Sequence, residues 1–271
     1  MIPLCNLHAH TTYCDGKNTA VEMVLGAIKA GCETLGFSGH SPMPFETDWC
    51  IPVDRLGEYK SEIRALKEEY KNSLEILLGI EYDALSSIDT ADFDYVIGSV
   101  HHVCREGEVI PVDLAADALK DYVGRLYDGD FYKFCKDYYE NMYSLCEKTE
   151  CDIVGHFDLV TKFNEGGALF DEGDRRYRFA SLEALDYLLE KDVIFEINTG
   201  ALSRGYRKSP YPAEFILKRM AEKNARIMIN SDTHAKDTVL YYYPEAVEYA
   251  KYCGVRELTV FKRGEFATLE I

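Results

Sequence analysis

Two histidines separated by a single residue follow the first apolar run of the sequence. In the segment NLHAHTTYCDG, residues 6–16, His8 and His10 occupy alternate positions at the end of a predicted strand. Residues i and i+2 of a strand point to the same side, so both imidazoles are expected to face one point. This arrangement suits a metal ion, but the H-x-H pattern also arises by chance. Its meaning depends on whether the chain supplies further ligands.

Short apolar runs alternate with longer amphipathic stretches along the chain. This alternation, repeated about seven times, predicts an α/β protein with parallel strands. No glycine-rich dinucleotide fingerprint follows the first strand, which favours a barrel over a doubly wound sheet. Segments 82–93 and 102–128 are expected to form long loops. The predicted strands are 2–7, 34–38, 74–80, 94–99, 152–155, 193–197, 226–230 and 257–261, and the predicted helices are 19–30, 54–71, 129–148, 174–190, 211–223 and 243–252.

Six of the seven histidines and two carboxylates come directly after predicted strands. In a β/α barrel these strand ends meet on one face, where active sites are built. A single histidine after a strand is more often a hydrogen-bonded loop residue. A barrel mouth crowded with imidazoles and carboxylates, however, would be costly to bury without a cation, so a metal site is predicted. In chain order the candidate ligands are His8, His10, His40, Glu81, His101, His156, Asp232 and His234.

Asp15 is a ninth candidate, in the segment CDGKN. Its position before Gly16 is also typical of a turn former, but a bridging ligand is the favoured interpretation. One zinc or iron ion is satisfied by about four to six donors. Nine nitrogen and oxygen donors therefore predict two or three divalent ions, with a carboxylate between them. Imidazole and carboxylate donors together fit Zn, Mn or Fe.

The bulk composition limits the class of partner. The 271 residues contain 30 Lys and Arg against 47 Asp and Glu, a net charge of −17. So acidic a surface disfavours binding to nucleic acid or to an anionic membrane. The nine scattered cysteines contain no C-x-x-C pair and predict reduced thiols in a cytoplasmic protein. The length and the uninterrupted pattern are expected to form one domain, residues 1–271, acting on a small molecule, whereas the sequence leaves the oligomeric state open.

The ordered motifs resemble those of a known superfamily. The segments NLHAHTTYCDG, GFSGHS, GIEYD, IGSVHHV, GHFDLVTKF, NTGAL and NSDTHAKDTV are similar to the polymerase-and-histidinol-phosphatase (PHP) superfamily, and specifically to its histidinol-phosphatase branch. The resemblance extends from residue 4 to about residue 240. It implies a distorted (β/α)7 TIM-like barrel, with the active site at the carboxyl ends of the strands, and a trinuclear metal centre.

The resemblance also implies how the ligands are shared among three ions. One ion would be held by His8, His10, Glu81 and Asp232, a second by Glu81, His101 and His156, and a third by Asp15, His40 and His234. Clustered divalent ions suit phosphate-ester hydrolysis because they polarise the phosphoryl oxygens and activate a water molecule for in-line attack. Asp232 or His234 is expected to protonate the leaving alkoxide.

Two basic residues are candidates for binding the phosphate. Arg204, in ALSRGYRKSPYP, is similar to an arginine that clamps the phosphate in the family, and its fork geometry suits bidentate contacts. Lys162, in DLVTKF, is the second candidate, although a solvated basic side chain remains an alternative there. The candidates for the cationic end of the substrate are Glu46, Asp48, Asp83 and Glu106, with solvated loop acids as the alternative.

The expected activity is hydrolysis of L-histidinol phosphate to L-histidinol and phosphate, a step of histidine biosynthesis. A metallo-phosphoesterase of the same fold that acts on nucleotides, nucleic-acid ends or phosphotyrosine is the alternative, and a non-catalytic metal-binding module is a third interpretation. The filled ligand positions oppose the third, and the acidic charge opposes nucleic acid.

Overall fold

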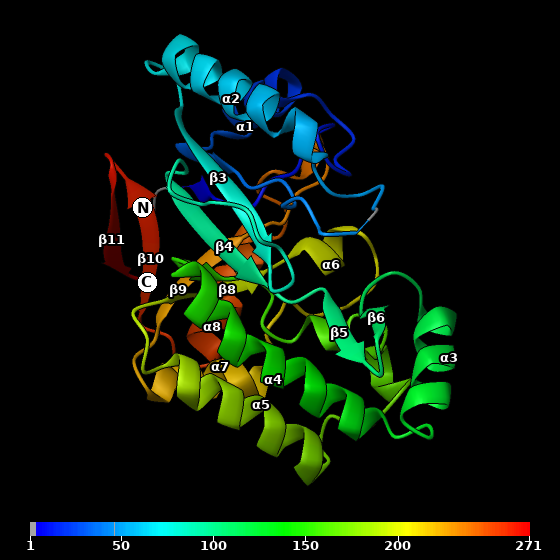
Figure 1. The fold of residues 1–271 in the computed structure, drawn as a ribbon. Helices are drawn as coiled ribbons and strands as arrows, with labels where there is room; N and C mark the ends of the chain where they lie inside the picture. The colour runs from blue at the N-terminus through cyan, green and yellow to red at the C-terminus, as the bar shows by residue number, and fades with distance from the viewer. Residues whose placement is uncertain (1–3, 46) are drawn as a thin grey trace.

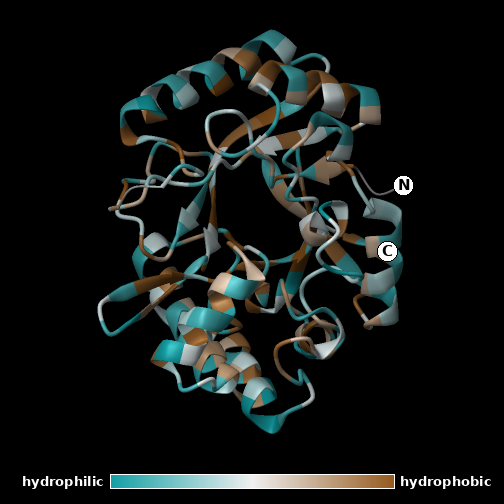
Figure 2. Cartoon of the chain, turned by 90° about the vertical axis from the view of Figure 1, so that its right-hand side faces the viewer, coloured by the Kyte–Doolittle hydropathy of each residue, from teal (hydrophilic) through white to brown (hydrophobic). Residues whose placement is uncertain are grey.

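A ring of seven parallel strands forms the centre of the computed structural model, which describes residues 4–45 and 47–271 apart from the side chain of Cys146 (Figures 1 and 2). Between the two ends of the ring, His10 N donates to Thr233 O at 2.9 Å. The sheet is therefore a nearly closed, distorted (β/α)7 barrel, as predicted. In ring order the strands are β1 (Cys5–Asn6), β2 (Thr34–Phe37), β3 (Glu75–Asp83), β4 (Tyr95–Ser99), β7 (Ile153–Val154), β8 (Ile194–Asn198) and β9 (Arg226–Asn230).

The six predicted helices lie outside the ring, with ends within three residues of the predicted ones (Figure 2). Local signals explain such boundaries. In the first helix Thr19 and Glu22 form a capping box, and Gly31 ends it with φ of 76°. Among the described residues no helix has the length and apolarity to cross a membrane. The six helices are α1 (Ala20–Ala30), α2 (Leu56–Tyr70), α4 (Phe131–Thr149), α5 (Arg175–Leu188), α7 (Glu214–Glu222) and α8 (Tyr243–Tyr252).

Shorter helical turns occur in the connections. They are α6 (Gly200–Ser203) and the 3₁₀ turns η1 (Val53–Arg55), η2 (Leu159–Thr161), η3 (Glu165–Gly167) and η4 (Lys236–Thr238). Residues 1–3 and 46 are not described, so the predicted start of the first strand at residue 2 and the candidate Glu46 lie outside the described residues.

Two segments differ from the predictions. Segment 102–128, predicted as a loop, contains the hairpin β5 (His102–Arg105) and β6 (Glu108–Pro111), followed by α3 (Ala116–Leu126) (Figure 1). The predicted strand 257–261 forms as β10 (Glu257–Lys262) but pairs antiparallel with β11 (Glu265–Glu270) outside the ring. The turn between them has Arg263 and Gly264 at positive φ, a conformation that closes a two-residue hairpin.

The barrel interior is filled from the end opposite the histidines. Tyr95 lies across it and donates its hydroxyl to Leu7 O at 2.5 Å. Val260 and Phe261 of β10 belong to the same buried cluster, so the outer hairpin covers this end. Gly36 and Gly79 leave room for Tyr95, because a Cβ atom at Gly36 would lie 2.3 Å from its hydroxyl oxygen and one at Gly79 would lie 2.3 Å from a ring carbon.

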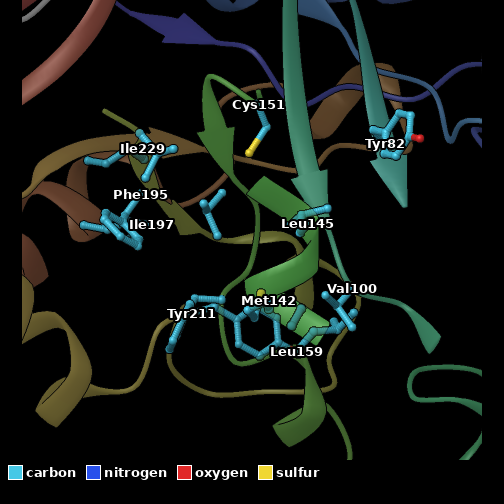
Figure 3. Close-up of a cluster of buried hydrophobic side chains, with 14 of the residues drawn as sticks. Tyr82, Val100, Met142, Leu145, Cys151, Leu159, Phe195, Ile197, Tyr211 and Ile229 are labelled. Carbon is cyan, nitrogen blue, oxygen red and sulfur yellow. The ribbon is translucent and has the colours of Figure 1, made fainter. Parts of the chain in front are cut away.

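A larger apolar cluster packs between the strands and the helices. Figure 3 shows Met142 and Leu145 of α4 beside Val100 and Leu159, all of them buried. A Cβ atom at Gly98 of β4 would come within 2.9 Å of Leu145, so the glycine allows the helix to approach the sheet closely. The helices thus hold the strands in position, and the strand ends carry the polar residues described next.

Gly79→Ala should overpack the barrel, because the added methyl group would lie 2.3 Å from the Tyr95 ring carbons. We expect a loss of about 1–3 kcal/mol in the free energy of unfolding, measured by urea denaturation. Gly57→Ala is the matched control, since Gly57 lies in exposed helix α2 with no atom within 4 Å of an added Cβ. Equal unfolding midpoints for the two variants would contradict this packing.

Candidate metal centre

The nine predicted ligands come together at the carboxyl end of the barrel. Their donor atoms form four overlapping groups, in each of which the atoms lie within 4.8 Å of one another. The buried groups are His8, Glu81 and His156; His8, His10 and Asp232; and His40, Glu81 and His101. A more open group contains His10, Asp15, His40 and His234.

These groups overlap the three ligand sets that the family resemblance implies, although their membership differs in part. Asp15, His40 and His234 do form one group, and His8, His10 and Asp232 form another. His101 and His156, which the resemblance places on one ion, fall into two separate groups that share Glu81. Glu81 belongs to two of the three buried groups but is absent from the group of His8, His10 and Asp232.

Glu81 lies at the centre of the cluster and is 1% exposed. Its Oε1 accepts a hydrogen bond from Ser99 Oγ at 2.7 Å and lies 2.8 Å from His156 Nε2 and 3.3 Å from His101 Nε2. Its Oε2 lies 2.8 Å from His40 Nδ1 and 3.3 Å from His8 Nε2. Burial alone would raise the pKa of this carboxyl group, but His8, His40 and His101 hold it well below its ordinary value.

Several buried donor atoms of this cluster lack a hydrogen-bond partner among the described residues. They are His8 Nε2, His10 Nε2 and Glu81 Oε2, and His10 Nε2 lies 3.6 Å from Glu81 Oε2. Buried polar atoms without partners are costly in a protein interior. A divalent cation satisfies imidazole lone pairs and a carboxylate oxygen together, so this donor set fits a metal centre.

Asp232 is held by its backbone and by two neighbours. Its φ is 45°, a left-handed conformation that aspartate adopts more readily than most residues. A Cβ atom at Gly200 would lie 2.7 Å from Asp232 Oδ2, so only glycine leaves room there. Oδ2 accepts from Arg204 Nη2 at 3.0 Å, whereas Oδ1 lies 3.3 Å from His10 Nε2. The two oxygens therefore face different partners.

The two predicted phosphate-binding side chains line the pocket that opens over the metal centre. This pocket has a volume of about 580 Å³ and is also lined by Asp15, His40 and His234. Arg204 is 27% exposed, and its Nη1 lies 2.7 Å from His234 Nδ1. Lys162 Nζ donates to the carbonyl and carboxylate oxygens of Asp113, at 2.9 and 3.1 Å.

Sequence reasoning missed two side chains that support this site and assigned a third to another role. Asp113, in the segment expected to be a loop, holds Lys162. Glu196 lies within strand β8 and contacts His8 Nδ1 at 2.7 Å. A lone carboxylate among the apolar residues of a predicted strand was the sequence signal that could have identified it. Asp83, predicted to contact substrate, is instead buried at the end of β3, with Oδ2 3.1 Å from His101 Nδ1.

Zinc binding to the metal-free protein should release protons. Burial lowers the pKa of His8, but Glu196, Glu81 and Asp232 outweigh it and raise that pKa well above its ordinary value. Burial also lowers the pKa of His101, but Glu81 and Asp83 outweigh it and raise that pKa well above its ordinary value. His10 releases no proton, because burial, His234 and His40 lower its pKa to about 3.

We therefore expect roughly one to two protons to be released per protein at pH 7, and zinc affinity to rise with pH. Calorimetric titration in two buffers with different ionisation enthalpies measures this number. A binding heat that does not depend on the buffer would contradict the expectation.

Comparison with known proteins gives a consistent result. The family model "PHP domain" matches residues 6–200. The chain is 31% identical to "Probable histidinol-phosphatase" of Deinococcus radiodurans, covering 96% of this chain and 97% of that protein. It is 26% identical to "Histidinol-phosphatase" of Bacillus subtilis, covering 89% and 97%.

A solved structure has the same fold. The histidinol phosphate phosphatase of Lactococcus lactis, crystallised with Zn, L-histidinol and phosphate, superposes with a TM-score of 0.70 at 22% identity, covering 98% of this chain and 100% of that one. The chain belongs to the PHP domain family, in its histidinol-phosphatase branch.

Proposed function

We propose that this protein is a metal-dependent phosphomonoesterase that hydrolyses L-histidinol phosphate to L-histidinol and phosphate. The observation that carries the proposal is the convergence of nine imidazole and carboxylate side chains at one end of the barrel, six of them lining a pocket with Arg204 and Lys162 at its wall. A pocket of about 580 Å³ is of the size that small-molecule sites have. The named relatives and the ligands of the Lactococcus lactis enzyme support this substrate.

The proposed cofactors are three divalent ions, with Zn, Mn and Fe as candidates. The four overlapping donor groups support more than one ion, and Glu81 suits a bridging role because its two oxygens face different histidines. When bound, the ions would polarise the phosphoryl oxygens and activate water. A cytoplasmic location is part of the proposal, and it is supported by the scattered cysteine positions, which contain no C-x-x-C pair.

Arg204 and Lys162 would bind the phosphate oxygens from the pocket wall. Arg204 keeps its Nη2 on Asp232 Oδ2 and its Nη1 near His234, so the guanidinium is held over the ligand cluster. Asp113 holds Lys162 in the same way. Fixed cationic donors stabilise developing phosphoryl charge better than mobile ones, because they need no reorganisation during the reaction.

Arg204→Ala should lower kcat/KM for L-histidinol phosphate by about 100-fold or more, because a positioned charged donor is lost. Phosphate release is measured with L-histidinol phosphate, a nucleoside monophosphate, phosphotyrosine and a short single-stranded DNA. Lys208→Ala, which removes a nearby exposed charge, is the control. Better turnover of another substrate by the unmodified protein would refute the proposed substrate.

The leaving alkoxide needs a proton, and Asp232 is our first candidate to deliver it. Burial raises the pKa of Asp232, but Arg204 and His8 hold it well below its ordinary value, so the carboxylate is ionised at neutral pH. In this proposal the carboxylate takes a proton from the attacking water, and its low pKa makes the protonated form a strong acid toward the alkoxide. His234 is the other candidate.

Asp232→Asn should reduce turnover of L-histidinol phosphate at least tenfold more than turnover of p-nitrophenyl phosphate, whose leaving group needs no proton. Metal content is measured for each preparation, because loss of an ion would lower the turnover of both substrates. His234→Asn is tested in parallel. If only the His234 variant discriminates between the substrates, the proton role belongs to His234.

A further inference from the structure

Glu196 is a buried carboxylate that belongs to none of the metal-ligand groups, yet it contacts two of the predicted ligands. It lies in the middle of β8 and is 1% exposed. Its Oε1 lies 2.7 Å from His8 Nδ1 and 3.0 Å from Asn230 Nδ2. Its Oε2 lies 2.9 Å from the backbone nitrogen of His156 and 2.7 Å from Asn198 Nδ2.

The directions of three of these four hydrogen bonds are fixed by the backbone. Asn230 Oδ1 accepts from Leu7 N at 2.7 Å, so its amide nitrogen must face Glu196. Asn198 Oδ1 accepts from Gly200 N at 2.8 Å, which orients that amide in the same way. The backbone nitrogen of His156 can only donate. Both oxygens of Glu196 are therefore acceptors.

The fourth contact decides which nitrogen of His8 carries a proton. An imidazole is more basic than a carboxylate, so the proton between Glu196 Oε1 and His8 Nδ1 lies on the nitrogen. In a neutral imidazole the lone pair is then on Nε2. That atom lies 3.3 Å from Glu81 Oε2 and 3.7 Å from Asp232 Oδ1, facing the ligand cluster.

We propose that Glu196 is a positioning residue that fixes the tautomer and ring orientation of His8, so that Nε2 is available to a divalent ion. Carboxylates that accept from the outer nitrogen of a metal-bound histidine hold the ring and increase its basicity. The proposal concerns metal binding alone and does not depend on which phosphate ester is hydrolysed.

Glu196→Gln tests the proposal because the structure leaves the new amide no suitable orientation. If its oxygen keeps the bond from His156 N, its NH₂ group faces His8 Nδ1 and Asn230 Nδ2. His8 must then accept at Nδ1 and carry its proton on Nε2, toward Glu81. In the opposite orientation the buried NH₂ group faces the donors His156 N and Asn198 Nδ2.

The first measurement is zinc affinity, determined by competition with a chromophoric chelator on the full chain. We expect Glu196→Gln to bind one zinc ion about 10–100-fold more weakly. Glu172→Gln is the matched control, because Glu172 accepts from Asn164 and Arg207 and belongs to none of the ligand groups. Unchanged affinity in a folded Glu196 variant, or an equal loss in the Glu172 variant, would overturn the proposal.

A double-mutant cycle separates an effect through His8 from a general structural effect. In a His8→Asn background, Glu196→Gln should cause little further loss of zinc affinity. A loss as large as in the unmodified background would mean that Glu196 acts elsewhere and would overturn the proposal.

The second measurement needs no variant at position 196. In zinc-loaded protein with ¹⁵N-labelled histidine, NMR should show His8 with a proton on Nδ1 and zinc on Nε2, with the signal assigned by its loss in His8→Asn. A proton on Nε2 would overturn the proposal even if Glu196→Gln failed to fold. Because no phosphate ester is present, a wrong substrate assignment would leave both measurements unaffected.

Discussion

The site depends on one buried carboxylate that must be compensated from several directions. Glu81 is almost completely inaccessible, and five imidazoles lie within 3.6 Å of its oxygens. An uncompensated charge in such surroundings would cost several kcal/mol. The compensating side chains follow or lie near the ends of β1, β2, β4 and β7. The charge of Glu81 can therefore be buried only when the ring of strands is nearly closed.

The two ends of the barrel meet different physical demands. At one end Tyr95 and the β10–β11 hairpin fill the interior with apolar groups, which excludes water and stabilises the ring. At the other end the interior is polar, and outer carboxylates hold the ligands from behind: Glu196 contacts His8, and Asp83 contacts His101. The apolar half thus provides a rigid frame in which the polar half can keep donor atoms close together without collapse.

Local sequence signals were sufficient for most of the secondary structure but not for segment 102–128. The periodic apolar residues of the long helices predicted the helix boundaries closely. In 102–128 each strand of the hairpin has only four residues, and the hairpin is held by Val103 and Ile110, whose burial comes from the surrounding cluster. The strand at 257–261 was recognised, but its antiparallel partner follows a turn that periodicity does not reveal.

The sequence by itself determined the parallel α/β architecture and the positions of the candidate ligands, because histidines and carboxylates placed directly after strands must converge wherever parallel strands form a barrel. Only the tertiary structure decided which of these donors share a group, and which side chains hold them. His101 and His156 fall into separate groups, and Glu196, Asp83 and Asp113 act as supports, because these relations depend on distances between strands far apart in the chain. Spacing along one strand carries no information about such distances.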